Sequence, residues 1–123
     1  MKLLPLPCLM LVTEPVDDLA LRVAQAVDGG VDAVQWRDKR KSVGKRGKVI
    51  AALASVTKDK ALLIANGDWE ANVREGARKV HLPEKSLPVG VVKFRIGNGA
   101  MVGKSVHSVA AAVQAQDAGA DYR

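Results

Sequence analysis

The chain alternates between short, mostly apolar runs and longer segments in which apolar residues recur every three or four positions. The short runs are typical of buried strands and lie at 8–12, 32–36, 61–66, 78–83 and 100–106. The longer segments are typical of helices and lie at 14–30, 42–56, 68–77, 88–98 and 107–119. Residues 120–123 are typical of the start of a sixth strand. The pattern therefore predicts a regular alternation of strand and helix.

Residues that start or stop helices support these boundaries. Pro15 is expected near the first turn of the first helix, and the pair Gly29 and Gly30 is expected to end that helix. Ser42 is expected to be the N-cap of the second helix. The phrases DGGVDAVQW, REGARKVHL and DAGADY each lead from a helix end through glycine into a strand.

Repeated strand–helix units of this length predict right-handed crossovers and a parallel sheet in one α/β domain, residues 1–123. The repeated helix-to-strand phrase favours a (β/α)8 barrel of the TIM type. An open doubly wound sheet is the alternative, because periodicity does not distinguish the two. A complete barrel has about 200 residues or more, so 123 residues predict a truncated barrel with its first five to six units.

Composition narrows the class of protein. No apolar run reaches the roughly 20 residues that a membrane-spanning helix needs. Two prolines interrupt the opening MKLLPLPCLMLV, which favours a strand over a signal peptide. The single cysteine, Cys8, is expected to be a buried apolar residue, and its lack of a partner fits a reducing, cytoplasmic location.

The positive charge is concentrated in one segment. Residues 38–48 carry six basic side chains and one acid, so they hold +5 of the net charge of +6. This distribution predicts one local anion-attracting loop and argues against a nucleic-acid-binding face. A solvated loop that leads into a helix is the alternative interpretation.

Polar residues follow the predicted strands, at the end of the barrel where such folds place their chemistry. The set is rich in cations and amides and consists of Thr13, Gln35, Arg37, Lys39, Asn66, Glu84, Lys85, Lys104, Ser105 and His107. Arginine, lysine, asparagine and serine suit a phosphorylated small molecule, and one histidine suits proton transfer.

The two histidines have different expected roles. His107, at a strand–helix junction, is a candidate acid/base, although His107 and Ser108 could instead cap the helix that follows. His81 lies inside a predicted strand and is expected to be an interior histidine with satisfied hydrogen bonds. Trp36 and Trp69 are expected to pack beneath the site rather than stack on bases.

Four motifs in order along the chain carry a family resemblance. They are VQWRDK, LLIANGDWEAN, GARKVHLPEKSLP and VGKSVHSVAAAVQAQDAGADY, and together they extend from about Leu9 to Tyr122. This set resembles the thiamine-phosphate synthase/TenI family. The resemblance implies a (β/α)8 barrel that handles a thiazole phosphate in thiamine biosynthesis.

The family has two branches that the metal-binding positions separate. Synthases use magnesium to join a pyrimidine diphosphate to thiazole phosphate, whereas TenI-type tautomerases move a proton without a metal. Gly67 and Ser86 stand where the synthase pattern has its two aspartates. Magnesium needs charged oxygen ligands, so the resemblance favours the TenI branch with no cofactor. The alternative is a magnesium-dependent synthase in which Asp68 or Glu84 replaces the missing ligands. A third possibility is a non-enzymatic, ligand-binding or regulatory remnant of the family.

The resemblance also implies roles for individual residues. Gln35, Arg37 and Lys39 match the family's Gln-x-Arg-x-Lys pattern, and with Asn66 and Ser105 they are expected to bind substrate or its phosphate. His107 is expected to be the catalytic acid/base, with no metal ligand. The expected partner is a small molecule, and exposed sheet edges predict a homo-oligomer.

Overall fold

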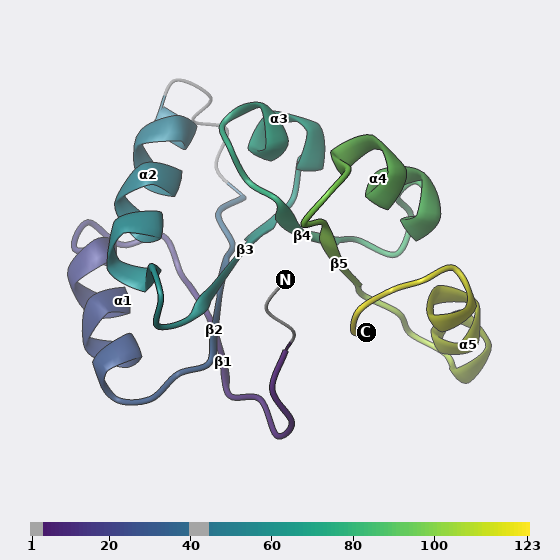
Figure 1. The fold of residues 1–123 in the computed structure, drawn as a ribbon, viewed down its shortest axis with the longest axis horizontal. Helices are drawn as coiled ribbons and strands as arrows, with labels where there is room; N and C mark the ends of the chain where they lie inside the picture. The colour runs from purple at the N-terminus through teal and green to yellow at the C-terminus, as the bar shows by residue number, and fades with distance from the viewer. Residues whose placement is uncertain (1–3, 40–44) are drawn as a thin grey trace.

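The computed structural model describes residues 4–39 and 45–123, and these form ten alternating elements (Figure 1). The strands are β1 (Met10–Val12), β2 (Ala33–Trp36), β3 (Leu62–Asn66), β4 (Lys79–Leu82) and β5 (Met101–Lys104). The helices are α1 (Leu19–Asp28), α2 (Arg46–Thr57), α3 (Trp69–Arg74), α4 (Val89–Ile96) and α5 (Val109–Asp117). Each of the five predicted strands and five predicted helices is therefore present, most of them with shorter bounds.

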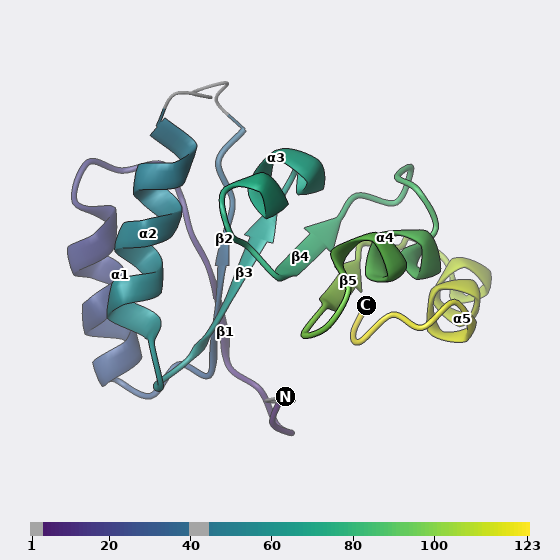
Figure 2. The ribbon, with the colours of Figure 1, turned by 45° about the horizontal axis from the view of Figure 1, so that its top comes forward.

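The strands form one parallel sheet in the order β1-β2-β3-β4-β5. Because consecutive strands are neighbours and crossovers are right-handed, every helix falls on the same side of the sheet. Figures 1 and 2 show the helices arranged around the convex side of the curved sheet. This is the winding of a barrel, and it rules out the doubly wound alternative, in which helices cover both faces.

The two faces of the sheet bury different side chains. On the convex side, Val34 and Trp36 of β2 pack with helix residues such as Leu53. On the concave side, Ile64 and Met101 form a second cluster, against which the N-terminal segment and Tyr122 pack. The alternation of side chains along each strand separates the helix-facing layer from the inner layer.

Some helix boundaries differ from their predicted positions. α1 begins at Leu19 after Asp18, five residues later than the predicted start at residue 14, so Pro15 precedes the helix. α5 begins at Val109, and the Ser108 side chain accepts a hydrogen bond from the Ala111 N–H. Ser108 thus caps this helix, as the alternative interpretation expected. Ser42, the expected cap of α2, lies outside the described residues.

The chain continues past α5 into the first contact of a sixth strand. Tyr122 forms a parallel bridge with Gly103, and the Tyr122 ring lies where a side chain on Gly103 would be. The prediction for 120–123 is correct to this extent. None of the helices in the described part of the chain has the length and apolar character to cross a membrane.

Candidate functional site

A row of polar side chains crosses the concave side of the sheet at the carboxyl ends of the strands. The strand register sets Asn66 beside His81, His81 beside Gly103, and Gly103 beside Tyr122. Gln35 joins this row from β2 through a hydrogen bond to Asn66. We call Gln35, Asn66, His81, Ser105 and Tyr122 the inner polar belt.

Gln35 and Asn66 form the first half of the belt. The Asn66 amide donates a hydrogen bond of 2.7 Å to Gln35 Oε1, and the Gln35 amide donates to Met10 Sδ at 3.4 Å. Gln35 is buried and Asn66 half-buried. Since a buried amide is costly to leave unpaired, each residue fixes the orientation of the other. The structure therefore brings together two residues that the sequence predicted for one site.

His81 occupies the centre of the other half. Its Nε2 lies 2.7 Å from Ser105 Oγ, and its Nδ1 lies 2.9 Å from the Tyr122 hydroxyl. Burial lowers the pKa of His81 and raises that of Tyr122, so both are neutral near pH 7. A neutral imidazole has one donor and one acceptor nitrogen, and the two hydroxyl groups satisfy both. The expectation of a satisfied interior histidine is confirmed.

A chain of contacts behind Asn66 supports the belt from the convex side. The Asn72 amide of α3 donates to the Asn66 backbone carbonyl at 3.3 Å. Arg46, at the start of α2, donates to Asn72 Oδ1 at 2.6 Å, and its guanidinium lies over the Trp36 ring. Asn72 is fully buried, so this contact fixes α2 and α3 behind the strand that carries Asn66.

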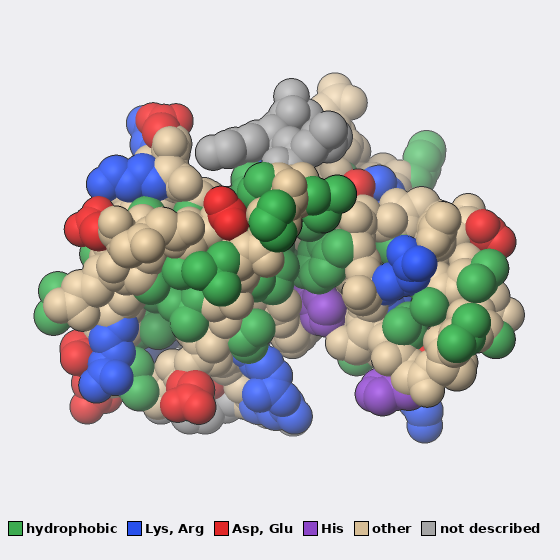
Figure 3. All heavy atoms as spheres, turned by 90° about the horizontal axis from the view of Figure 1, so that it is seen from below, with side chains coloured by type: hydrophobic (Ala, Val, Ile, Leu, Met, Phe, Trp, Pro, Cys, Tyr) green, Lys and Arg blue, Asp and Glu red, His purple; other side chains and the backbone are tan. Residues whose placement is uncertain are grey.

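His107 lies outside the belt, in the loop before α5. Its ring Nδ1 lies 3.0 Å from Glu84 Oε1, and its backbone N–H donates to Glu84 Oε2 at 3.0 Å. The hydrogen bonds from the His107 side chain and backbone lower the pKa of Glu84. The His107 side chain is 77% exposed, whereas His81 is half-buried. In Figure 3 the two histidines form separate purple patches.

The predicted phosphate-binding cations are on the extension of β2. Arg37 and Lys39 are both exposed, and the Arg37 backbone N–H donates to Thr13 Oγ1 at 3.2 Å. This bond fixes the backbone after β2 while the guanidinium group faces solvent. Residues 40–44 of the predicted basic segment 38–48, with two of its six basic side chains, lie outside the described residues.

The structure thus joins some predicted residues and separates others. Gln35 and Asn66 are bonded to each other, and Ser105 joins them through His81. The described side-chain contacts of His107 lead to Glu84 instead. No described side-chain contact joins His107 to Asn66, so the convergence of these two residues on one rim stays a prediction.

Sequence reasoning assigned His81 a structural role and did not place Tyr122 in the site. A usable signal was present, because Val80 and Leu82 flank His81 in a strand. Alternate residues face opposite sides, so apolar neighbours packed against helices imply that His81 faces the interior. Trp36 and Trp69 pack among apolar residues on the convex side, as expected.

The described residues do not form a metal centre. No three of their histidine, cysteine, aspartate or glutamate side chains come together. Asp68 accepts a hydrogen bond from the Ala71 N–H and caps α3, while both Glu84 oxygens contact His107. The two candidate substitute carboxylates are therefore already engaged in other contacts.

Consecutive parallel strands, helices on one side and polar residues at the strand ends define a protein of the (β/α)-barrel class. The family described as thiamine monophosphate synthase (TMP-TENI) matches residues 9–123. The chain belongs to this family, which confirms the family named from the four motifs.

Individual relatives agree with this assignment. The chain is 39% identical over 101 residues to a thiamine-phosphate synthase of Natronomonas pharaonis, covering 81% of this chain and 47% of that protein. It is 42% identical over 106 residues to the thiamine-phosphate synthase of Methanoculleus marisnigri, covering 85% and 49%. The chain thus spans about half the length of these relatives.

A solved structure supports the barrel fold. The thiamine phosphate pyrophosphorylase from Pyrococcus furiosus superposes with a TM-score of 0.81 at 26% identity, over 94% of this chain and 57% of that one. The five-stranded parallel sheet therefore has the arrangement of a known member of this enzyme class.

Proposed function

We propose that this chain acts in thiamine biosynthesis and binds a phosphorylated thiazole at the inner polar belt. The observation that carries the proposal is the hydrogen bond between Asn66 and Gln35, beside His81 at the strand ends. It orders amide groups on two neighbouring strands where barrel proteins bind ligands. Family membership supports the choice of ligand.

Each part of the ligand has a chemically suited partner. Arg37 and Lys39 offer exposed cations for the phosphate, and a guanidinium can donate two parallel hydrogen bonds to it. The Asn66, Gln35 and His81 side chains offer neutral donors and acceptors for the polar atoms of the ring. The concave apolar residues exclude water from the ring face.

The names of the relatives favour thiamine-phosphate synthesis as the reaction. This reaction joins a pyrimidine diphosphate to thiazole phosphate and releases diphosphate. The belt would orient the thiazole nitrogen toward the pyrimidine carbon.

Magnesium does not fit the described residues in this role. Gly67 offers no side chain, and the Ser86 hydroxyl donates to the Leu87 carbonyl. Magnesium takes charged oxygen ligands in octahedral geometry, and these two positions supply none.

The contact between Glu84 and His107 favours a second candidate, thiazole tautomerisation. This reaction removes a proton from one ring carbon and returns a proton elsewhere, which imidazole performs well near neutral pH. Glu84 holds the His107 Nδ1 side, which leaves Nε2 facing away from the pair as the proton-transferring atom. No metal is needed for this chemistry.

Binding can be tested by calorimetry with thiazole phosphate and with the unphosphorylated thiazole alcohol. The proposal expects the phosphate to bind about tenfold or more tightly, and Arg37→Gln to remove that preference, because a charged hydrogen bond contributes about 1.5–3 kcal/mol. Arg74→Gln, an exposed arginine on α3, is the matched control. Equal binding of phosphate and alcohol would contradict the proposal.

The two reactions are separated by parallel assays of the chain. Formation of thiamine phosphate from the two substrates would establish synthesis, and repeating it with a chelator would report metal dependence. Tautomerisation would be established by exchange of solvent deuterium into thiazole phosphate. The Glu84→Gln variant should slow this exchange, and the His107→Ala variant should abolish it. If the chain binds thiazole phosphate but shows neither activity, its role is ligand binding.

We also propose self-association, because the β1 edge of the sheet offers unpaired backbone groups. Within the described residues β1 pairs only with β2. The outer edge of β5, in contrast, is bonded to Asp121 and Tyr122. Exposed edges favour pairing with another chain. Sedimentation should show a molecular mass that rises with protein concentration, and a constant monomer mass would contradict this.

A further inference from the structure

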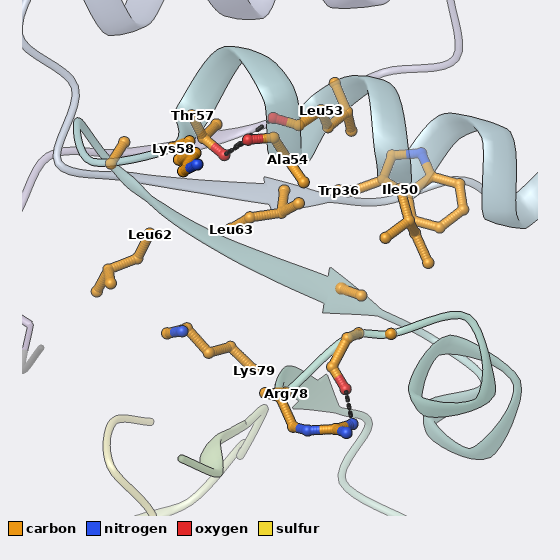
Figure 4. Close-up of a pocket in the computed structure, with 14 residues that line it drawn as sticks. Trp36, Ile50, Leu53, Ala54, Thr57, Lys58, Leu62, Leu63, Arg78 and Lys79 are labelled. Atoms are coloured by element: carbon orange, nitrogen blue, oxygen red, sulfur yellow. Dashed lines mark hydrogen bonds between the residues drawn. The ribbon is translucent and has the colours of Figure 1, made fainter. Parts of the chain in front are cut away.

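A hollow on the convex side of the sheet lies apart from the inner polar belt. It has a volume of about 350 Å³ and runs between α2 and the connection from α3 to β4 (Figure 4). α3 has only six residues, so it does not cover the full length of β3. The outward side chains of Leu63 and Ala65 are therefore left as the floor of an open groove.

Apolar and positively charged side chains line this groove. Ile50, Leu53 and Trp36 supply apolar surface, and three cations, Lys58, Arg78 and Lys79, line the same hollow. The lining includes no carboxylate. Thr57 also lines it, but its hydroxyl donates to the Leu53 carbonyl at 2.9 Å and is already satisfied.

The cations are available for a ligand. Within the described part of the chain, Lys58, Arg78 and Lys79 form no ion pair, whereas the nearby Lys60 lies 3.7 Å from Asp28. In the described part of the chain, the one side-chain hydrogen bond of these three residues is from Arg78 Nη1 to the Ala77 carbonyl, seen in Figure 4. Most guanidinium donors of Arg78 therefore remain free.

From the apolar floor, the three cations and the volume, we propose that this groove binds a small amphipathic anion. Such a ligand has a hydrocarbon or aromatic body and one carboxylate, sulfonate or phosphate group. The volume falls within the roughly 300–1,000 Å³ of ordinary ligand pockets. The body covers Leu63 and Ala65, and the anionic group lies among Lys58, Arg78 and Lys79.

This site is distinct from the proposed thiazole site. The sheet separates them, because Ala65 packs with the helix-facing cluster while Ile64 faces the concave cluster. Because the sheet lies between the two sites, a ligand in the groove is expected to leave thiazole-phosphate binding possible. The groove ligand would contact α2, whose first residue, Arg46, bonds to Asn72 behind Asn66.

Sodium octanoate and 1-octanol, which share a chain length and differ in charge, test the proposal by NMR titration of methyl groups. Octanoate should shift the methyl signals of Ile50, Leu53 and Leu63 and bind about tenfold more tightly than octanol. Arg78→Gln combined with Lys79→Gln should remove that difference, and Lys60→Gln should not. Both changes are at charged, solvent-accessible positions, so the fold is expected to persist.

Three results would overturn the proposal. They are equal affinity for octanoate and octanol, an unchanged preference in the Arg78→Gln, Lys79→Gln variant, and shifts confined to exposed apolar residues elsewhere, such as Phe94 on α4. The comparison of ligands uses the unmodified chain and therefore does not depend on how the variants fold.

Discussion

The two histidines of this chain lie in contrasting surroundings. His81 is in a strand, and its position follows from sheet register: Asn66 lies on one side and Gly103 on the other. His107 is in a loop, and its position depends on one carboxylate, Glu84. Groups on strands are held by the whole sheet, whereas a loop residue is held by a few contacts. Perturbing each region should therefore have effects of different size.

The largest loss of stability is expected from a substitution where the inner polar belt meets the start of the sixth strand. Gly103→Val would place a side chain where the Tyr122 ring lies, and such overpacking should lower the free energy of unfolding by about 3 kcal/mol. Chemical denaturation monitored by circular dichroism measures this. Gly90→Ala on α4, where a methyl group has room, is the control and should be neutral or stabilising. An equally stable Gly103→Val variant would show that Tyr122 does not pack there.

Breaking the amide pair should have the next largest effect. Asn66→Ala leaves Gln35 Oε1 buried without a donor, and the cost should be about 1–2 kcal/mol of unfolding free energy. Asn98→Ala, in an exposed turn, should change stability little. If both variants unfold at the same denaturant concentration, the bond between Asn66 and Gln35 does not order the belt.

The pH dependence of stability should reveal His81 specifically. Burial lowers its pKa in the folded chain relative to the unfolded one, so the unfolded state binds more protons as the solution is acidified. Stability should therefore fall as pH drops below about 6.5, the ordinary histidine value, toward the lower folded pKa. Thermal unfolding between pH 7.5 and 5 measures this, and His81→Gln should flatten the profile. A profile that only His107→Gln flattens would reverse the assignment.

The smallest effect on stability is expected at the exposed pair. The hydrogen bonds from His107 lower the pKa of Glu84. The contribution of this pair to the free energy of unfolding is therefore present above the ordinary glutamate pKa and is lost as pH falls through the lowered folded value. Glu84→Gln should hardly change the unfolding midpoint, because exposed pairs contribute little. It should change the nitrogen NMR shifts of the His107 ring, which report which nitrogen carries the proton. Unchanged shifts would mean that Glu84 does not orient the ring.

Most of the strands and helices could be predicted from the sequence, and the predictions that differ from the structure do so for physical reasons. Apolar runs located the strands because the helix-covered face of a barrel strand is always buried, as Val34 and Val80 are. The start of the first helix was predicted too early because the fixed φ of Pro15 suits the turn before a helix as well as the helix itself. Chain order alone placed Arg37 and His107 at one rim, but it gave no information about Glu84, 23 residues earlier, which holds the His107 side chain.

The sequence predicted that His81 is an interior histidine with satisfied hydrogen bonds, but it did not predict which groups satisfy them. Its partners are Ser105 and Tyr122, 24 and 41 residues away. Only the sheet register brings them together. Gln35 and Asn66 were easier to predict, because they lie at or next to the ends of two consecutive strands, which are neighbours in a barrel.

An NMR titration of the chain with thiazole phosphate tests the central claim most directly. The account predicts progressive shifts of the Gln35 and Asn66 side-chain amides and of the His81 ring, with the Arg37 guanidinium following in step. Shifts that leave these four groups unchanged, while other parts of the chain respond, would contradict the claim that the inner polar belt binds the ligand.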